Sequence, residues 1–117
     1  MSDLIRPNRR VLIFSAHAAD FCSRAGGTIA RFVDVGSSVH IVDFSYGELC
    51  ESPGLWARDP APSVAEIKQI RATEIQAAAA ILGASAECLD FGDCPLLIGP
   101  ERRQQVLDLF RQHQPDL

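Results

Sequence analysis

The sequence predicts an α/β fold: a Rossmann-like, three-layer α/β/α arrangement with a mainly parallel sheet. Short apolar runs at residues 10–15 and 39–44 are typical of strands that are buried on both faces. Segments with helical spacing follow these runs, so strands and helices alternate along the chain. The 117 residues have the length of one domain, which we take as residues 1–117.

The first predicted unit is strand, helix, strand. After the strand at residues 10–15, the pair Gly26-Gly27 opens a predicted helix over residues 28–35, and Gly36 ends it. The second strand then follows at residues 39–44.

The second half begins with a long predicted loop at residues 45–62, which contains three prolines and two glycines. Loops of this length in compact domains are usually functional. Ser63, with Glu66 three residues later, forms the pattern of a capping box. It begins a predicted helix that Gly83 ends.

A third strand is predicted at residues 87–91 and a third helix at residues 100–112, with Val106, Leu107 and Phe110 as its inner face. Pro115-Asp116-Leu117 then resembles the entry to another strand. Because three strands make a thin parallel sheet, we expect the chain to be the N-terminal portion of a larger domain, apparently truncated after the third helix.

Composition excludes several classes of protein. Forty-seven per cent of the residues are apolar and 22% are charged, which is ordinary for a globular domain and argues against disorder. No apolar run is long enough to span a membrane, and the N-terminus lacks a secretory signal, which favours the cytoplasm. The net charge of −4 and scattered basic residues argue against a nucleic-acid partner. The four cysteines have no C-x-x-C spacing and are predicted to be free thiols.

The most informative segment is A-H-A-A-D-F at residues 16–21, directly after the first strand. Ligands of open α/β sheets bind at the carboxyl ends of strands. His17 and Asp20, three residues apart in a tight turn, can both reach one cation there. Taken alone, His17 could instead bond to backbone, and Asp20 could cap a helix.

These residues resemble the first motif of the PIG-L/LmbE-like family of zinc-dependent hydrolases, A-H-P-D-D followed by G-G-T. The later S-Y-G-E, the helix with Arg71 and Glu74, A-A-A-I-L-G and L-D-F-G-D follow the family's order. The resemblance implies that His17 and Asp20 bind zinc. It also places Ala19 where the family's deacetylases have their general base.

Within the family, A-H-x-A-D-F, S-x-G-E-x-x-E-S and Leu55-Trp56 resemble the branch that hydrates 4-oxalomesaconate to 4-carboxy-4-hydroxy-2-oxoadipate in gallate breakdown. Amide hydrolysis needs a carboxylate beside the metal, which Ala19 cannot supply. Two alternatives stay open: an N-acetylglucosaminyl-type deacetylase and a non-catalytic Rossmann-like binding module. No G-x-G-x-x-G follows the first strand, which weighs against dinucleotide binding.

A hydratase needs a proton shuttle and groups that bind the carboxylates of its small tricarboxylate substrate. Glu51, preferred over Glu48, is the predicted shuttle, although lone loop carboxylates are more often solvated. Arg71 and Arg24 are predicted to bind substrate carboxylates, and Arg71 could instead pair with Glu74.

The remaining expectations concern assembly and the other polar residues. The resemblance implies a third zinc ligand, a histidine that this sequence does not contain, so we expect this chain alone to bind zinc weakly and turn over little. A homo-oligomer is expected because a thin parallel sheet leaves apolar surface uncovered. His40 and His113 are interpreted as structural, and Asp90 and Asp93 as turn residues.

Overall fold

The computed structural model describes residues 4–117. At its centre is a three-stranded parallel sheet. Its strands are β1 (Arg10–Ser15), β2 (Ser38–Asp43) and β3 (Ser85–Cys88), in the order β1-β2-β3. Val11 pairs with Val39, and Ile41 pairs with Ala86. The predicted parallel sheet is therefore confirmed.

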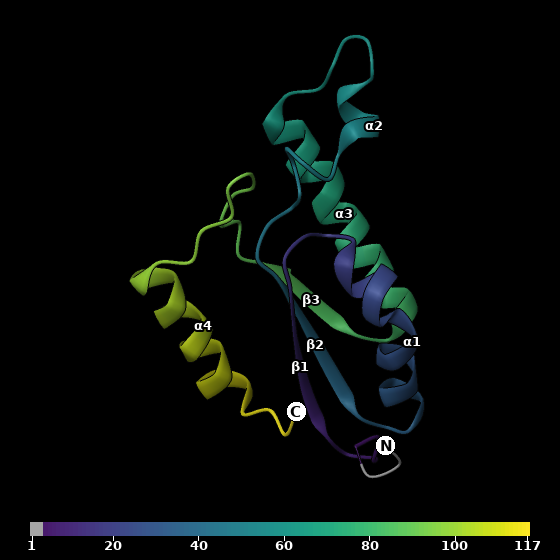
Figure 1. Cartoon of the computed structure of the whole chain (residues 1–117). Coiled ribbons are helices and arrows are strands. Elements are labelled where there is room, and N and C mark those ends of the chain that lie inside the picture. Colours follow the sequence, from purple (N-terminus) through teal and green to yellow (C-terminus); the bar gives the residue numbers. More distant parts are fainter. Residues whose placement is uncertain (1–3) are drawn as a thin grey trace.

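Helices cover both faces of this sheet (Figure 1). Helices α1 (Asp20–Asp34) and α3 (Val64–Leu82) lie on one face, and α4 (Pro100–His113) crosses the other. The chain passes from β1 to β2 and from β2 to β3 in the same direction across the sheet, and each connection has the usual right-handed sense. Helices α1 and α3, which lie in these connections, are therefore on the same side of the sheet. The three-layer α/β/α prediction is confirmed.

The two faces differ in how much apolar surface they bury. Beneath α1 and α3 lies the larger core: Val11, Ala18, Phe21, Ile29, Phe32, Val39, Ile41, Ile75 and Ala79. Beneath α4 the buried cluster consists of Leu12, Val42 and Leu109, with Phe14 and Leu89 against it. Because hydrophobic stabilisation scales with the apolar area buried, α4 is held less strongly than α1 and α3.

Helix α1 begins at Asp20, so the predicted start at residue 28 was wrong. Phe21, Ile29 and Phe32 are all buried and lie on one side of this helix. This apolar stripe outweighs the roughly 1 kcal/mol that each interior glycine costs relative to alanine. Gly26 and Gly27 consequently lie inside the helix instead of opening it.

Helix α3 agrees with its predicted ends. The Ser63 side chain accepts a hydrogen bond from the Glu66 N–H, and the Glu66 side chain accepts one from the Ser63 N–H. At the other end Gly83 adopts φ 74°, and a Cβ there would lie 2.8 Å from Cγ1 of Val33. Glycine is therefore required both by the left-handed backbone and by the close approach of α1.

Two predicted segments differ from the structure. The loop at residues 45–62 contains a short helix, α2 (Pro53–Trp56). Strand β3 occupies Ser85–Cys88 instead of residues 87–91, because Asp90 has a φ of 53° that a strand does not accept.

The predicted inner face of the third helix was also partly wrong. Leu109 is buried in α4, whereas Leu107 is 50% exposed. Phe110 is 45% exposed, but its ring centroid lies 5.3 Å from that of Phe14 in β1, so this residue does face the sheet. Val106, Leu109 and His113 are spaced by three and four residues, so they share the side of the helix that faces the sheet.

The last residues of the chain run beside β1 at the edge of the sheet. The Leu12 N–H donates to the Leu117 carbonyl at 2.9 Å, and the Asp116 N–H donates to the Arg10 carbonyl at 2.8 Å. The pattern that resembled a strand entry therefore does pair with the sheet. In the part of the chain that the structure describes, no helix has the length and apolarity needed to cross a membrane.

Candidate active site at the carboxyl ends of the strands

His17 and Asp20 lie together directly after β1. The His17 N–H donates to Oδ2 of Asp20 at 3.0 Å, and the Asp20 N–H donates to the His17 carbonyl at 3.1 Å. These two bonds close a tight turn and leave Nδ1 of His17 3.5 Å from Oδ2 of Asp20. The turn thus brings together the two residues that the sequence analysis assigned to a metal.

Asp93 binds the other nitrogen of the same ring. Its Oδ1 lies 3.0 Å from Nε2 of His17, and its Oδ2 accepts the N–H groups of Leu49 and Cys50 at 3.1 and 2.8 Å. Burial acts to raise the pKa of Asp93, but the hydrogen bonds from Cys50, Leu49 and His17 outweigh it and hold the pKa below the ordinary 3.8.

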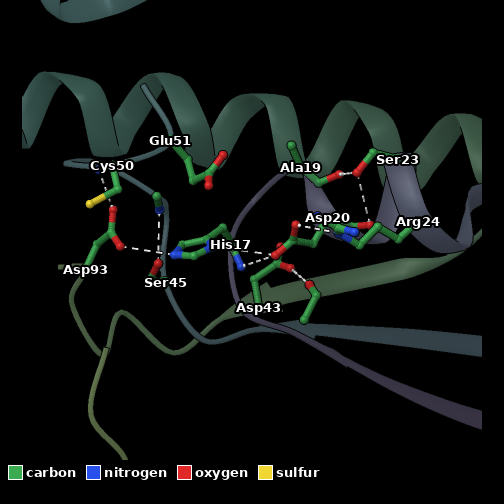
Figure 2. Close-up of polar contacts among 12 residues, drawn as sticks. His17, Ala19, Asp20, Ser23, Arg24, Asp43, Ser45, Cys50, Glu51 and Asp93 are labelled. Carbon is green, nitrogen blue, oxygen red and sulfur yellow. Dashed lines mark hydrogen bonds and ion pairs between the residues drawn. The ribbon is translucent and has the colours of Figure 1, made fainter. Parts of the chain in front are cut away.

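The ionised Asp93 carboxylate determines which nitrogen of His17 is available to a metal ion. Because Asp93 accepts, Nε2 of His17 carries a proton, and in the neutral ring Nδ1 then keeps its lone pair. That lone pair faces an Asp20 carboxylate oxygen at 3.5 Å, so two acceptors face each other (Figure 2). A cation between them satisfies both, and a carboxylate on the far nitrogen is the usual support for a metal-binding imidazole.

Asp43, at the end of β2, adds a third carboxylate next to this pair. Its Oδ1 accepts a hydrogen bond from the Ser15 hydroxyl, while its buried Oδ2 has no hydrogen-bond partner among the described residues. Burial, and to a lesser degree the charge of Asp20, raises the pKa of Asp43 to about 6, against the opposing effects of Ser15 and His17. A site with this excess of carboxylates favours a positive ion.

Gly47 holds the loop after β2 against His17. It has a φ of +66°, and a Cβ there would lie 2.7 Å from Cβ of Glu51 and 3.4 Å from Cβ of His17. Glu51 and His17 therefore flank the same glycine. Figure 2 shows Glu51 on this loop near His17 and Ala19.

The two predicted shuttle residues have different surroundings. Glu51 is exposed, so its carboxylate can exchange protons with water. Glu48 is buried, its Oε1 lies 3.8 Å from Nζ of Lys68, and its backbone carbonyl accepts the indole N–H of Trp56 at 2.8 Å. The position of Glu48 suits support of the loop, whereas that of Glu51 suits the shuttle.

The two predicted substrate-binding arginines are also placed differently. Arg71 donates to Oγ of Ser52 at 3.0 Å, to Oε2 of Glu74 at 2.8 Å and to the Glu51 carbonyl. Arg24 is largely exposed, with Nε 3.6 Å from Oδ1 of Asp20. Arg71 thus holds the Glu51 loop, and Arg24 lies beside the predicted metal ligands.

The sequence analysis did not identify Asp43 or Asp93 as site residues. Asp43 ends β2 and Asp93 follows β3, at the same edge of the sheet as His17, so these positions were the available signal. Asp93 was interpreted as a turn residue, and its contact with His17 shows that this interpretation was incomplete.

A second group of residues could also hold a metal ion. Across residues 4–117, ligand atoms of His40, Glu87 and His113 all lie within 4.8 Å of one another. This group lies on the sheet face beneath α4, away from His17. Around His17 the described residues supply an imidazole and a carboxylate, both of which zinc accepts. His17 and Asp20 are two ligands, whereas a catalytic zinc usually has three from the protein.

Comparison with known proteins identifies the family. The family described as "PIG-L: GlcNAc-PI de-N-acetylase" matches residues 12–117. A 4-oxalmesaconate hydratase of Pseudomonas putida is 42% identical over 110 residues, which are 94% of this chain and 42% of the relative. A 1D-myo-inositol 2-acetamido-2-deoxy-alpha-D-glucopyranoside deacetylase of Rhodococcus jostii is 36% identical over 65% of this chain and 26% of its own length.

Solved structures agree with this assignment. The 4-carboxy-2-hydroxymuconate hydratase of Pseudomonas putida has a TM-score of 0.86 and 42% identity, over 90% of this chain and 43% of that one. The N,N'-diacetylchitobiose deacetylase of Pyrococcus horikoshii has a TM-score of 0.81 and 28% identity, over 92% and 39%. This chain spans about two fifths of the length of the hydratases it matches. With its fold, its strand-end site and a family match that covers nearly its whole length, the chain belongs to the PIG-L family.

Proposed function

We propose that this chain is the N-terminal part of a zinc-dependent hydratase that adds water across a carbon–carbon double bond of 4-oxalomesaconate, giving 4-carboxy-4-hydroxy-2-oxoadipate in gallate breakdown. The observation that carries the proposal is the oriented pair of His17 and Asp20 with alanine at position 19. The 42% identity to a 4-oxalmesaconate hydratase supports this choice of substrate.

His17 and Asp20 would hold the zinc. When bound, zinc would act as a Lewis acid that polarises the substrate's carbonyl or enol oxygen. Asp93 keeps the proton on Nε2 of His17 and so directs Nδ1 toward Asp20. The remaining ligand would have to come from residues beyond those of this chain.

Glu51 would move the proton. Hydration requires a base that takes a proton from the attacking water while the neighbouring carbon is protonated. Glu51 is exposed, and its side chain and that of His17 lie on either side of Gly47. Its backbone carbonyl accepts a hydrogen bond from Arg71. Arg71 therefore acts as a positioning residue for Glu51, in addition to its proposed contact with a substrate carboxylate.

The substrate's negative charges need cations in a site that is rich in carboxylates. Arg71, together with Arg58 and Glu51, lines a depression of about 360 Å³ near the predicted shuttle. Arg24 lies next to the predicted metal ligands, with its guanidinium beside Asp20. Two guanidinium groups can bind separate carboxylates of a tricarboxylate in two-point geometry.

The deacetylase alternative is favoured by the family's other relatives, and position 19 discriminates between the two. A deacetylase needs a carboxylate there to serve as base, and this chain has Ala19. A non-catalytic binding module would leave the orientation of His17 by Asp93 without a purpose.

The test follows loss of 4-oxalomesaconate with zinc present, using this chain alone and this chain joined to the C-terminal part of the Pseudomonas putida hydratase. We expect little turnover from the chain alone and hydration by the joined protein, abolished by His17→Asn or Asp20→Asn. Deacetylation of an N-acetylglucosamine substrate by the joined protein, with no hydration, would contradict the proposal.

The same proposal includes a cytoplasmic location and self-association. Leu97, Leu107 and Phe110, which are 64%, 50% and 45% exposed, supply apolar surface that a second copy would cover. Sedimentation equilibrium of the chain is expected to give a mass above that of the monomer.

A further inference from the structure

We propose that His40, Glu87 and His113 form a second metal site, for a zinc ion that fastens α4 to the sheet. This site is separate from the strand-end site, and the inference does not depend on the proposed hydratase function. His40 comes from the middle of β2, Glu87 from β3 and His113 from the last turn of α4.

The sheet geometry places these side chains between two layers. His40 alternates with Ile41, which faces α1 and α3, so His40 faces α4 like Val42. Glu87 pairs in register with Val42, and Ser85 pairs with His40, so both point to this same face. Figure 1 shows α4 as the element that covers this face.

Polar side chains at these positions are unusual. Strands of a parallel sheet covered on both faces are normally apolar on both, because helices pack against them. Here the space between β2 and α4 holds two imidazoles whose ring centroids are 4.3 Å apart and whose planes differ by 18°. Such groups are costly between layers unless they have partners.

The ligand atoms are close enough for one ion. Nε2 of His40 lies 3.2 Å from Oε1 of Glu87, and an atom of His113 lies within 4.8 Å of both. Two imidazoles and a carboxylate are a ligand set that zinc accepts in proteins. Binding requires His113 to tilt, since nearly parallel rings must direct their lone pairs to a common point.

Ser85 supports this role for His40. Its Oγ lies 2.6 Å from Nδ1 of His40. A hydroxyl that accepts the Nδ1 proton leaves Nε2 with a free lone pair facing Glu87, and a cation completes that arrangement. The nearby Arg10 guanidinium pairs with Asp116, with Nε 3.8 Å from Oδ2.

The surroundings leave room for a fourth ligand. A cavity of about 190 Å³ is lined by His40, His113, Ser85 and Pro115, among others, and it can admit the water that completes a tetrahedral zinc site. The effect on the fold follows from the small apolar contact of α4, in which only Leu109 is buried. A bound ion would join β2 and β3 to α4, which is otherwise held by little apolar area.

The experiment titrates Zn²⁺ into the 117-residue chain by calorimetry, follows Co²⁺ by its visible absorption, and measures amide exchange across α4. We expect one binding event in addition to the weak one at His17 and Asp20, loss of at least tenfold in its affinity in His113→Asn and Glu87→Gln, and slower exchange in α4 with zinc. Removing a group that only hydrogen-bonds to a metal ligand lowers metal affinity roughly 10-fold to 100-fold, and removing a ligand itself should lower it at least as much.

His17→Asn is the matched control, and it should leave this binding event unchanged. Glu87→Gln guards against misfolding, because the Glu87 side chain is 42% exposed and tolerates substitution. If this binding event keeps its affinity in both ligand variants, or weakens in His17→Asn as it does in His113→Asn, the proposal is overturned. Zinc binding that leaves exchange in α4 unchanged, or no zinc binding at all, would also overturn it.

Discussion

Two histidine clusters in this molecule use the same groups in different surroundings. At the strand ends, His17 meets Asp93, whose side chain is 3% exposed and held by two backbone N–H groups. Under α4, His40 meets Glu87, whose side chain is 42% exposed and bonded to His40. The carboxylate of the first cluster is therefore held by backbone hydrogen bonds before any ligand arrives, whereas that of the second pairs with His40 at a solvent-accessible position.

This difference suggests separate roles. A catalytic site requires side chains whose orientation does not depend on substrate, since misplacement lowers the rate. The cluster around His17 meets that requirement through the turn at Asp20, the glycine at position 47 and the buried Asp93. The cluster around His40 includes a partly exposed carboxylate, that of Glu87, which suits an ion that adds stability.

The largest expected effect comes from Gly47→Ala. The new Cβ would meet Cβ of Glu51 at 2.7 Å, on a backbone with φ +66°. Left-handed strain costs about 1–2 kcal/mol and overpacking about 1–3 kcal/mol, so we expect a loss of about 3 kcal/mol in the free energy of unfolding. Urea denaturation measures it.

Gly36→Ala is the control for this substitution. Gly36 has a φ of +88° but nothing within 4 Å of an added Cβ, so it carries the backbone strain without the clash. We expect a loss of about 1 kcal/mol. Equal losses in the two variants would show that the approach of Glu51 and His17 at Gly47 is not a tight contact.

The next effect is that of Asp93→Asn. The substitution weakens the bonds from Leu49, Cys50 and His17, and we expect a loss of about 1–2 kcal/mol at neutral pH. The pKa of Asp93 is lower in the folded chain than its ordinary 3.8, so its contribution is present above that value. It is lost as the pH falls toward the folded pKa.

The difference in stability between wild type and Asp93→Asn should therefore shrink as the pH falls below about 4. Denaturation series from pH 7 to pH 3 measure it. A difference that stays constant over this range would mean that Asp93 does not act through its charge.

The smallest effect is expected from Glu87→Gln in the metal-free chain. The pair with His40 is solvent-accessible, and exposed ion pairs contribute about 0–1 kcal/mol. We expect less than about 0.5 kcal/mol by the same denaturation measurement. A loss as large as that of Asp93→Asn would remove the contrast between the clusters.

The sequence was sufficient for two of the strands, for the ends of α3 and for the proximity of His17 to Asp20. Apolar runs identified β1 and β2, and Ser63, Glu66 and Gly83 identified the ends of α3, because these signals are local. The motif residues His17 and Asp20 were placed correctly at the end of β1 for the same reason.

What the sequence could not show depends on contacts between distant segments. Asp93 reaches His17 across 76 positions, and nothing local distinguishes it from a turn aspartate. Asp43 is the last residue of an apolar strand, where a buried carboxyl is unexpected. His40 and His113 meet only because α4 returns across the sheet, so each alone reads as a structural histidine.

The central claim is that His17, oriented by Asp93, presents Nδ1 beside Asp20 to a zinc ion. Nitrogen NMR of ¹⁵N-histidine-labelled chain measures this directly during a zinc titration in Glu87→Gln, where the second site is weakened. We predict that zinc shifts the Nδ1 signal of His17 while Nε2 keeps its proton, and that Asp20→Asn abolishes the shift. A zinc-induced shift at Nε2, or none at His17 up to millimolar zinc, would contradict it.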